Sequence, residues 1–497
     1  MSKRQNIIFI LTDQQMVSSI GRYGSTICKT PNIDALAEEG VTFANAYASC
    51  PICTPARASI QTGLYPFKHG MQTNIYTRGC MIHELPDSPM LLSRRLQKQG
   101  YQTGYTGKWH LGFGDNADED PEYKNHLKDT PVFKDIIVKR GTLPSDVGYY
   151  GDDFPGHGGI GERYNQYKEY LKENNIEYKK KCIHEGYPRI EEILSGEEST
   201  VPHFITNQAI KHIGELNDKE APFFYMLNFW GPHEPYNVAT EYVDLYRDTP
   251  IPEWKSFREP QDNKPVIHNA HRDPVKMEWS LYETFLRYYY AGVTAVDAEI
   301  GRLIDYLKDN NLYEDTIIIF SADHGESLGV HGGLKDKSFF MYEEICKIPL
   351  IIKSAGENIR ENEFETGFVS TCDFYSTVLE LAGVDRKSSQ RDGLSLVPLL
   401  NNEDTDWREC VVTESSGLDF LLFTQRMIRY KNAKYVFNCG GLDELYDLKQ
   451  DPSEMDNLIN SVSHNGLLGE MRLRLAEWME INKDGLLERY KKLRVMI

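Results

Sequence analysis

Short apolar runs alternate with amphipathic segments along most of the chain. Residues 6–13, NIIFILTD, form an apolar run that ends in an acidic residue, which predicts a buried strand. Residues 31–48 have the pattern of a helix followed by a short strand, and residues 88–107 repeat this order. The first part of the chain therefore predicts strands and helices in alternation.

The same alternation continues beyond residue 220. Residues 221–236 begin with an apolar run that breaks at a Gly-Pro pair, and residues 293–323 combine a helix of i, i+3, i+4 apolar spacing with a strand. Residues 347–356, KIPLIIKSAG, predict one further buried strand. Strands separated by helices predict a large mixed, mostly parallel sheet that is sandwiched by helices.

Two regions depart from this pattern. Residues 113–200 are polar and rich in Tyr, Gly and Asp, with no clean period, and we interpret them as a loop-like insertion around the mouth of a pocket. Residues 401–497 predict short antiparallel strands and a final helix, which together would form a small α+β domain. The predicted fold class is therefore α/β, with a large domain over residues 1–400 and a smaller C-terminal α+β domain.

Composition limits the partners and the location that we expect. The 497 residues carry a formal net charge of −19 and no block of Lys and Arg, which argues against nucleic acid as a partner. No apolar run approaches the ~18 residues of a membrane helix, so no membrane partner is expected. The apolar run near the N-terminus leads into Asp13 rather than into a signal-peptide cleavage site, and we expect a cytoplasmic protein.

Polar residues of the types used in catalysis follow several of the predicted strands. Asp13-Gln14, Lys108-Trp109-His110, His233 and Asp323-His324 each come directly after an apolar run. In open α/β sheets, the chemistry collects at the carboxyl ends of the strands. The sequence therefore predicts a single site that draws on four strand ends.

A pair of cysteines, Cys50 and Cys53, has the spacing C-x-x-C. A redox dithiol would need a small βαβ context with a helix that starts at the first cysteine. A zinc site would need a second pair of ligands, and the sequence has no second C-x-x-C. The nine cysteines are odd in number and widely scattered, which favours reduced thiols.

The stretch that begins at the second of these cysteines, CTPARASIQTG, resembles the signature of the type I sulfatases, C-x-P-[SA]-R followed by T-G. In that family a maturation enzyme oxidises the cysteine, here Cys53, to Cα-formylglycine, and Cys50 is then incidental. The resemblance implies the fold of the alkaline phosphatase superfamily. Further blocks resemble the family in the same order: ILTDQQ, TPNIDALAEEGVTFANAYA, GYTGKWHLG, GPHEPY, FSADHGESLGVHG, KDKSFFMYEEICKIPLII and ELYDLKQDPSEMDNL.

The resemblance also implies a divalent cation beside residue 53, with Asp13, Gln14, Asp323 and His324 as its other ligands. Hard oxygen donors favour Ca²⁺, with Mg²⁺ as an alternative. The commonest family pattern has a second aspartate where this chain has Gln14. A neutral amide lowers the charge of the ligand set by one, which makes Mn²⁺ conceivable as well.

The family implies roles for the remaining site residues. One hydroxyl of the aldehyde hydrate attacks sulfur, and the other later expels sulfate. Arg57 and Lys108 would hold the hydrate oxygens, and Lys337, which neighbours Lys335 and Asp336 in the chain, would hold the sulfate. His110 would be the base that triggers release of sulfate, and His233 the acid that protonates the leaving oxygen.

The sequence leaves other activities open. A phosphonate monoester or phosphodiester hydrolase of the same superfamily can carry the same motif, and a non-catalytic protein could bind sulfated ligands with Cys53 unmodified. The expected activity is a sulfuric ester hydrolase that acts on small sulfated molecules. Sulfated mono- or oligosaccharides, such as glycosaminoglycan fragments, are the favoured substrates, because the polar, aromatic segment 113–200 could line a sugar pocket.

Overall fold

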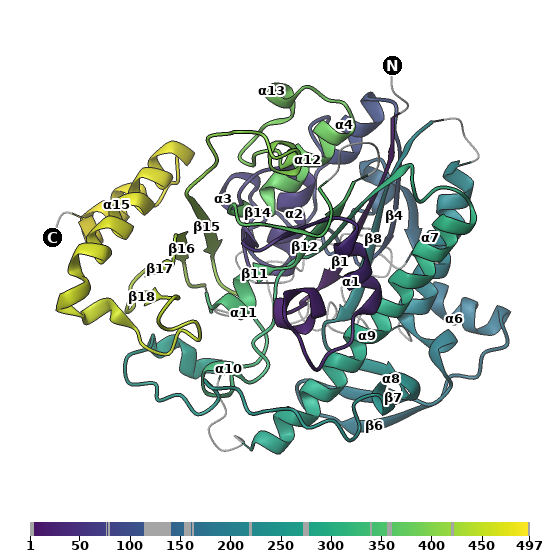
Figure 1. Ribbon diagram of the computed structural model, residues 1–497, viewed down its shortest axis with the longest axis horizontal. Helices are drawn as coiled ribbons and strands as arrows, with labels where there is room; N and C mark the ends of the chain where they lie inside the picture. The colour runs from purple at the N-terminus through teal and green to yellow at the C-terminus, as the bar shows by residue number, and fades with distance from the viewer. Residues whose placement is uncertain are drawn as a thin grey trace, which may run out of the picture.

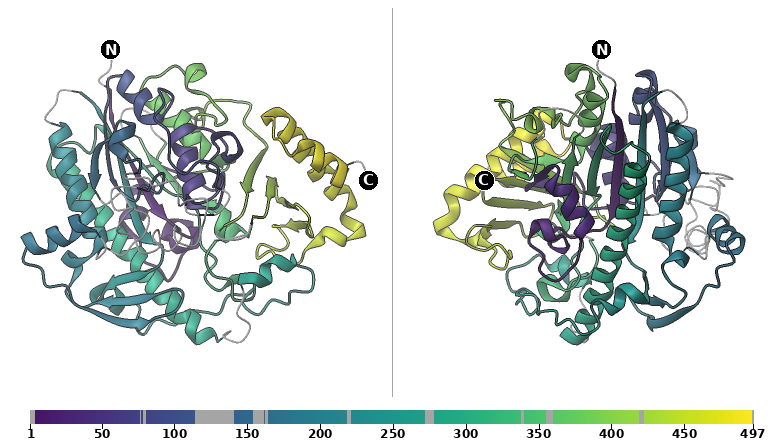
Figure 2. Two further views of the ribbon diagram at one scale, coloured as in Figure 1. Left: turned by 180° about the vertical axis from the view of Figure 1, so that it is seen from behind. Right: turned by 45° about the vertical axis from the view of Figure 1, so that its right-hand side comes forward.

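A mixed sheet forms the centre of the molecule (Figures 1 and 2). The computed structural model describes residues 4–75, 77, 80–113, 141–153, 161, 164–217, 221–271, 278–337, 340–354, 360–418 and 422–495. Within these residues, eight strands form this sheet, and all neighbouring pairs are parallel except the two pairs that β12 makes. In order across the sheet, they are β13 (Glu363–Glu365), β2 (Val41–Phe43), β12 (Leu350–Lys353), β10 (Thr316–Ala322), β1 (Asn6–Asp13), β8 (Phe223–Pro232), β4 (Gln102–Gly107) and β5 (Tyr150–Asp153).

Helices cover both faces of this sheet, as the sequence predicted. Ile7, Phe9 and Leu11 of β1 pack on one side, while Ile8 and Ile10 pack on the other, so both faces of the strand are buried. The first side is covered by α2 (Cys53–Thr62), α4 (Leu92–Lys98) and α12 (Cys372–Leu381). The second side is covered by α1 (Pro31–Glu38), α7 (Val201–Asn217) and α9 (Trp279–Asp309).

The strand predicted over residues 347–356 divides at Pro349. Its first part, β11 (Lys347–Ile348), pairs with β3 (Ala46–Tyr47) in a small sheet that also contains β14 (Val369–Ser370). Its second part is β12 of the main sheet. Proline has no backbone N–H for a strand ladder, so the chain changes its pairing partner at this residue.

The region expected to be loop-like, residues 113–200, contains regular elements within its described part. Besides β5 at the edge of the main sheet, they are α6 (Asn165–Glu173), β6 (Lys180–His184) and β7 (Ile190–Ile193). The last two form a small sheet with β9 (Tyr236–Ala239). β6 and β7 pair with each other, but β7 also pairs with the distant β9, and β5 pairs with the distant β4, which the local pattern of apolar residues cannot reveal. Residues 114–140 lie outside the described residues.

A four-stranded antiparallel sheet lies near the C-terminus, where the sequence predicted one (Figure 1). Its strands, in order, are β15 (Cys410–Ser415), β16 (Gln425–Tyr430), β17 (Ala433–Asn438) and β18 (Glu444–Asp447). The helix α15 (Asn465–Asn482) packs on one face through Met471, Leu475 and Met479. The opposite face packs against the main body through Val411, Met427 and Val436. The domain boundary at residue 400 stays a prediction.

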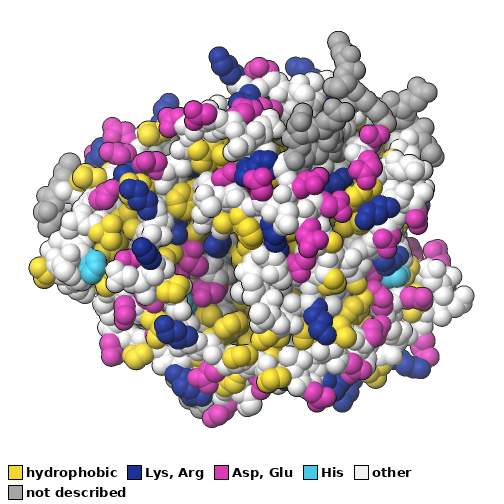
Figure 3. All heavy atoms as spheres, viewed as in Figure 1, with side chains coloured by type: hydrophobic (Ala, Val, Ile, Leu, Met, Phe, Trp, Pro, Cys, Tyr) yellow, Lys and Arg dark blue, Asp and Glu magenta, His cyan; other side chains and the backbone are white. Residues whose placement is uncertain are grey.

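Short helices connect the larger elements. They are α3 (Pro66–His69), α8 (Thr240–Asp244), α10 (Val330–Gly333), α11 (Glu343–Cys346), α13 (Arg386–Ser389), α14 (Val397–Leu400) and α16 (Leu487–Tyr490). Acidic and basic side chains are intermixed over the face of the molecule in Figure 3. None of the described helices is both long enough and apolar enough to cross a bilayer.

Candidate active site

Four neighbouring strands bring the candidate residues together at one edge of the main sheet. β10, β1, β8 and β4 are parallel and adjacent, so their carboxyl ends meet at the same edge. Asp13 is the last residue of β1, and Asp323 and His324 directly follow β10. Lys108 follows β4 and His233 follows β8. The predicted convergence of four strand ends is therefore present in the structure.

Cys53 enters this group from the opposite direction, as the first residue of α2. Its Sγ lies 3.2 Å from Nε2 of His324 and 3.9 Å from Oδ1 of Asp13. The ammonium of Lys108 donates to the same sulfur over 3.5 Å. Every residue of α2 is buried, so the positive end of the helix dipole faces a dry site. Cys53, Asp13, Asp323 and His324 place ligand atoms within 4.8 Å of one another.

Arg57 lies one helical turn after Cys53 and points to the same side, which explains the four-residue spacing of the motif. Its Nε donates to Oδ2 of Asp323 over 2.9 Å, and its Nη2 donates to Oδ2 of Asp13 over 3.1 Å. Both pairs are buried, so the guanidinium offsets two carboxylates that would otherwise repel each other. Arg57 engages one oxygen of each carboxylate and leaves Oδ1 of each for other partners.

The electrostatic field changes sign across the site. Burial alone would raise the pKa of the Cys53 thiol, but Lys108, Lys337 and His324 outweigh it and hold this pKa well below its usual range. Burial lowers the pKa of His324, but Asp323 and Cys53 outweigh it and raise this pKa to about 9. Position 53 therefore stabilises an anion, while the position beside the two aspartates favours a cation.

Lys337 lies within the site, whereas its neighbour Lys335 lies on the surface. The Lys337 ammonium donates to Oε1 of Gln14 over 2.7 Å and to Oδ1 of Asp336 over 3.1 Å. It also lies 3.0 Å from Nε2 of His233. Lys335 is half-buried; its ammonium lies over the rings of Tyr282 and Phe285 and donates to the backbone carbonyl of Tyr187. Lys337 is the lysine that contacts the predicted residues Gln14 and His233.

His110 completes the set of predicted residues. Its backbone carbonyl accepts a hydrogen bond from the Thr54 hydroxyl over 2.8 Å, and its side chain is among the groups that lower the pKa of the Cys53 thiol. The structure thus brings together the residues that the sequence singled out: Asp13, Gln14, Cys53, Arg57, Lys108, His110, His233, Asp323, His324 and Lys337.

Three further residues of the site were missed from the sequence. Asn228 of β8 accepts from Arg57 over 3.4 Å, and Glu326 and Asp336 both accept from the side-chain amide of Gln14. Glu326 follows the predicted His324 by two residues, and Asp336 precedes Lys337, so proximity in the chain was the available signal. Cys50 is incidental to the site, because it is buried in a small apolar cluster.

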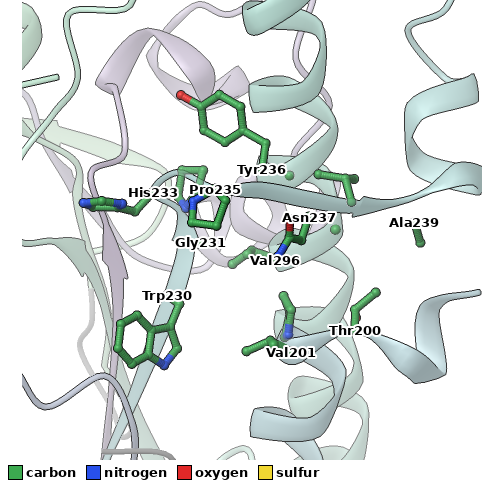
Figure 4. Close-up of a pocket in the computed structure, with 15 residues that line it drawn as sticks. Thr200, Val201, Trp230, Gly231, His233, Pro235, Tyr236, Asn237, Ala239 and Val296 are labelled. Carbon is green, nitrogen blue, oxygen red and sulfur yellow. The ribbon is translucent and has the colours of Figure 1, made fainter. Parts of the chain in front are cut away.

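An apolar cavity of about 50 Å³ borders the site at the turn between β8 and β9 (Figure 4). It is lined by residues of β9 and by Val201 and Val296 from the helices α7 and α9. His233 lies at its margin, apart from the residues that the two helices contribute (Figure 4). The ring of Trp230, which also lines the cavity, lies 5.3 Å from the Lys108 ammonium.

Known proteins resemble the chain over almost its whole length. It is 29% identical to the uncharacterized sulfatase YidJ of Escherichia coli over 97% of this chain and 88% of the relative. It is 26% identical to the N-acetylglucosamine-6-O-sulfatase of Bacteroides thetaiotaomicron, with the same coverage. The phosphonate monoester hydrolase of Agrobacterium radiobacter has the same fold, with a TM-score of 0.75, 23% identity and coverage of 97% and 95% of the two chains.

The chain is thus an α/β protein with the same fold as that enzyme, and its site lies at the carboxyl ends of the parallel strands. The family model "Sulfatase" matches residues 5–384, and the model "N-sulphoglucosamine sulphohydrolase, C-terminal" matches residues 329–481. The chain belongs to the sulfatase family and is a sulfuric ester hydrolase.

Proposed function

We propose that the chain releases sulfate from a sulfated mono- or oligosaccharide of the glycosaminoglycan-fragment type, with formylglycine made from Cys53 as the nucleophile. The similarity to an N-acetylglucosamine-6-O-sulfatase supports a sugar substrate. The observation that carries the proposal is the position of Cys53, which lies between buried cations and a pair of aspartates. The maturation enzyme and the cytoplasmic location stay predictions.

The donor set fits a divalent cation beside residue 53. Arg57 occupies Oδ2 of Asp13 and Asp323, so their Oδ1 atoms would face an ion, and Oδ1 of Asp323 is held in place by the backbone N–H groups of Gln14 and His324. Nδ1 of His324 lies 2.9 Å from the carbonyl of Gly325, which places the proton on Nδ1 and the lone pair on Nε2. Oxygen donors favour Ca²⁺, with Mg²⁺ or Mn²⁺ as alternatives. A cation bound here would lower the pKa of a hydroxyl on residue 53.

Three buried cations are placed to stabilise the negative charge that develops on the sulfuryl oxygens. Lys108 and Arg57 lie on the side of residue 53, and Lys337 lies between Gln14 and His233. These charges are already in position before the substrate binds. Such preorganised charge typically supplies the largest part of the catalytic effect.

The two histidines move protons in this proposal. Nδ1 of His233 lies 2.5 Å from the carbonyl of Glu234, so Nε2, which lies 3.0 Å from the Lys337 ammonium, is the ring nitrogen that exchanges a proton with the leaving oxygen. The side chain of His110 acts on residue 53 itself, where it takes the proton whose loss releases sulfate. Separate histidines therefore serve the leaving group and the nucleophile.

The proposal is tested with protein whose modification state is known. Conversion of Cys53 to formylglycine lowers the intact mass by about 18 Da before hydration. The converted protein, supplied with Ca²⁺, is then assayed on sulfated sugars, an aryl sulfate and an aryl phosphonate, with Cys53→Ala as the control. We expect the sulfated sugars to be the best substrates. Preference for the phosphonate, or for the aryl sulfate alone, would contradict the proposal.

The role of His233 predicts a dependence on the leaving group. His233→Asn should lower kcat/KM for N-acetylglucosamine 6-sulfate by about 10²–10⁴-fold, because an alkoxide leaves poorly without a proton. The loss should be much smaller for nitrophenyl sulfate, whose leaving group is a stable anion. Equal losses on both substrates would assign His233 a different role.

A further inference from the structure

Gln14 has its side-chain amide fixed in one orientation. Its Nε2 donates to Oε2 of Glu326 and, over 3.1 Å, to Oδ1 of Asp336. Its Oε1 accepts from the ammonium of Lys337 over 2.7 Å. A carboxylate only accepts hydrogen bonds and an ammonium only donates them. The three partners therefore exclude the flipped amide, in which all three contacts would be repulsive.

Glu326 is itself held rigidly. Its side chain is buried, and Oε1 accepts from the backbone N–H of Leu328 over 3.0 Å and from that of Asp336 over 2.7 Å. These contacts leave Oε2 to receive the amide of Gln14. One carboxylate thus joins the end of β1 to the segment that carries Lys337.

The contact between Gln14 and Glu326 also affects the charge of the site. Gln14 is neutral at a position where the family pattern most often has an aspartate, as noted above, so the inner ligand set has one negative charge fewer. Glu326 and Asp336 place carboxylates directly behind the Gln14 amide. Hydrogen bonds from Nε2 to two carboxylates increase the negative charge on Oε1, because they polarise the amide. The carboxylates behind Gln14 therefore supply part of the negative charge that the direct ligands lack.

We propose that Glu326 is a positioning residue for the cation: it keeps Oε1 of Gln14, and not Nε2, available as a ligand, and it adds negative charge behind that ligand. This inference rests on the proposed function, which places a divalent cation beside Gln14. Glu326 does not contact the substrate in this proposal, and it acts through Gln14 alone.

Glu326→Gln tests the proposal with nearly the same shape. Each of the two amides can then be either the donor or the acceptor of the hydrogen bond, so Gln14 is free to turn Nε2 towards the cation. We expect the dissociation constant for Ca²⁺, measured by calorimetry on the metal-free full chain, to rise about tenfold or more. Glu444→Gln is the matched control, because Glu444 is equally buried but lies in β18 of the C-terminal sheet. The Ca²⁺ affinity of this control variant should equal that of the wild type.

Exchanging the residue types of Gln14 and Glu326 tests whether the two side chains act as a pair in the folded protein. Gln14→Glu alone opposes two buried carboxylates, so the metal-free protein should unfold at lower denaturant concentration than the wild type. Adding Glu326→Gln restores a donor–acceptor pair of reversed sense, and the double variant should recover part of this loss. Asp336→Asn removes the second acceptor of Gln14 and should weaken Ca²⁺ binding less than Glu326→Gln.

The outcomes distinguish the two levels of inference. If the wild type binds no divalent cation, the proposed metal site fails together with this inference. If the wild type binds Ca²⁺ and cleaves sulfate esters but Glu326→Gln binds Ca²⁺ with wild-type affinity, only the role of Glu326 is overturned. Independent, additive effects of the two exchanged residues on unfolding would likewise contradict the coupling between them.

Discussion

Single charged groups in the site are each shared between two partners. Arg57 joins Asp13 to Asp323, and the Lys337 ammonium joins Gln14 to Asp336 while it lies beside His233. Because each group is buried, removal of one leaves its partners uncompensated. Substitutions in this network should therefore affect function by more than the loss of one contact.

Lys337 and Lys335 form a matched pair for testing this at the residue scale. Lys337→Met should lower kcat/KM for a sulfate ester by about 10²–10³-fold, because a fixed cation near the sulfuryl oxygens is lost. Lys335→Met should change it little, because that ammonium lies over Tyr282 and Phe285 and donates to the carbonyl of Tyr187. Steady-state kinetics on both variants checks the prediction, and a larger loss in Lys335→Met would reverse the assignment.

Most of the site could be predicted at this scale, and the reason is chemical. Asp13, Lys108 and Asp323 each follow an apolar strand, and a charged residue at the end of a buried strand is rarely accidental. Glu326 and Asp336 could not be found in this way. Their role arises from hydrogen bonds to Gln14 across more than 300 residues of chain, and no local pattern encodes that contact.

The long helix α9 contacts both strands and helices of the main body. This helix, Trp279–Asp309, packs against β8, β9, α1, α7 and α8. It also supplies Asp297, whose carboxylate accepts from the backbone N–H groups of Asn32 and Ile33 at the start of α1. The first turn of α1 is thus capped by another helix and not by its own preceding residue.

Two glycines of α9 predict opposite effects of the same substitution. Gly292→Ala should raise the free energy of unfolding by about 0.5–1 kcal/mol, because alanine favours a helix and the new methyl group would lie 3.6 Å from Val238 beside the apolar cavity. Gly301→Ala should lower it by about 1–3 kcal/mol, because its methyl group would meet the Asn32 side chain at 2.6 Å.

Asn32 cannot move aside at no cost, since its Nδ2 donates to Asp297 over 2.9 Å. Chemical denaturation of the two variants beside the wild type provides the comparison. Stabilisation by Gly301→Ala, or destabilisation by Gly292→Ala, would show that the packing around α9 differs from this description.

Strands that are buried on both faces could be predicted from the sequence, whereas strands that are held mainly by hydrogen bonds to a neighbouring strand could not. The apolar runs of β1, β8 and β10 identified the central strands because both of their faces are covered. The short strands β5 and β6 gave no such signal, since β6 is only partly buried and β5, at the edge of the main sheet, depends on its pairing with β4. Local apolar spacing cannot report a partner that is remote in the chain.

Across the whole molecule, buried charges tie the C-terminal sheet to the main body. Lys434 of β17 is fully buried and lies 2.7 Å from Glu454 and 3.3 Å from Glu343 of α11. Arg429 of β16 adds a contact of 3.3 Å to Glu343. Such pairs are costly to break, so the sheet and the body should lose their structure together.

Lys434→Met tests this connection. Loss of the ammonium leaves Glu343 and Glu454 buried without their cation, and the free energy of unfolding should fall by about 3–5 kcal/mol. Lys449→Met, at an exposed position in the same region, is the control and should change it little. Denaturation followed by both fluorescence and far-UV circular dichroism would detect a separate transition of the C-terminal sheet, which would argue against the tie.

The complete burial of α2 implies that any modification of Cys53 precedes folding. Cys53 is 1% exposed, and Arg57 and the strand ends close around it. A macromolecular catalyst cannot reach this thiol once the helix has docked. Any enzymatic oxidation of Cys53 must therefore act on the nascent or unfolded polypeptide. The yield of modified protein then depends on the rate of oxidation relative to the rate at which the core folds.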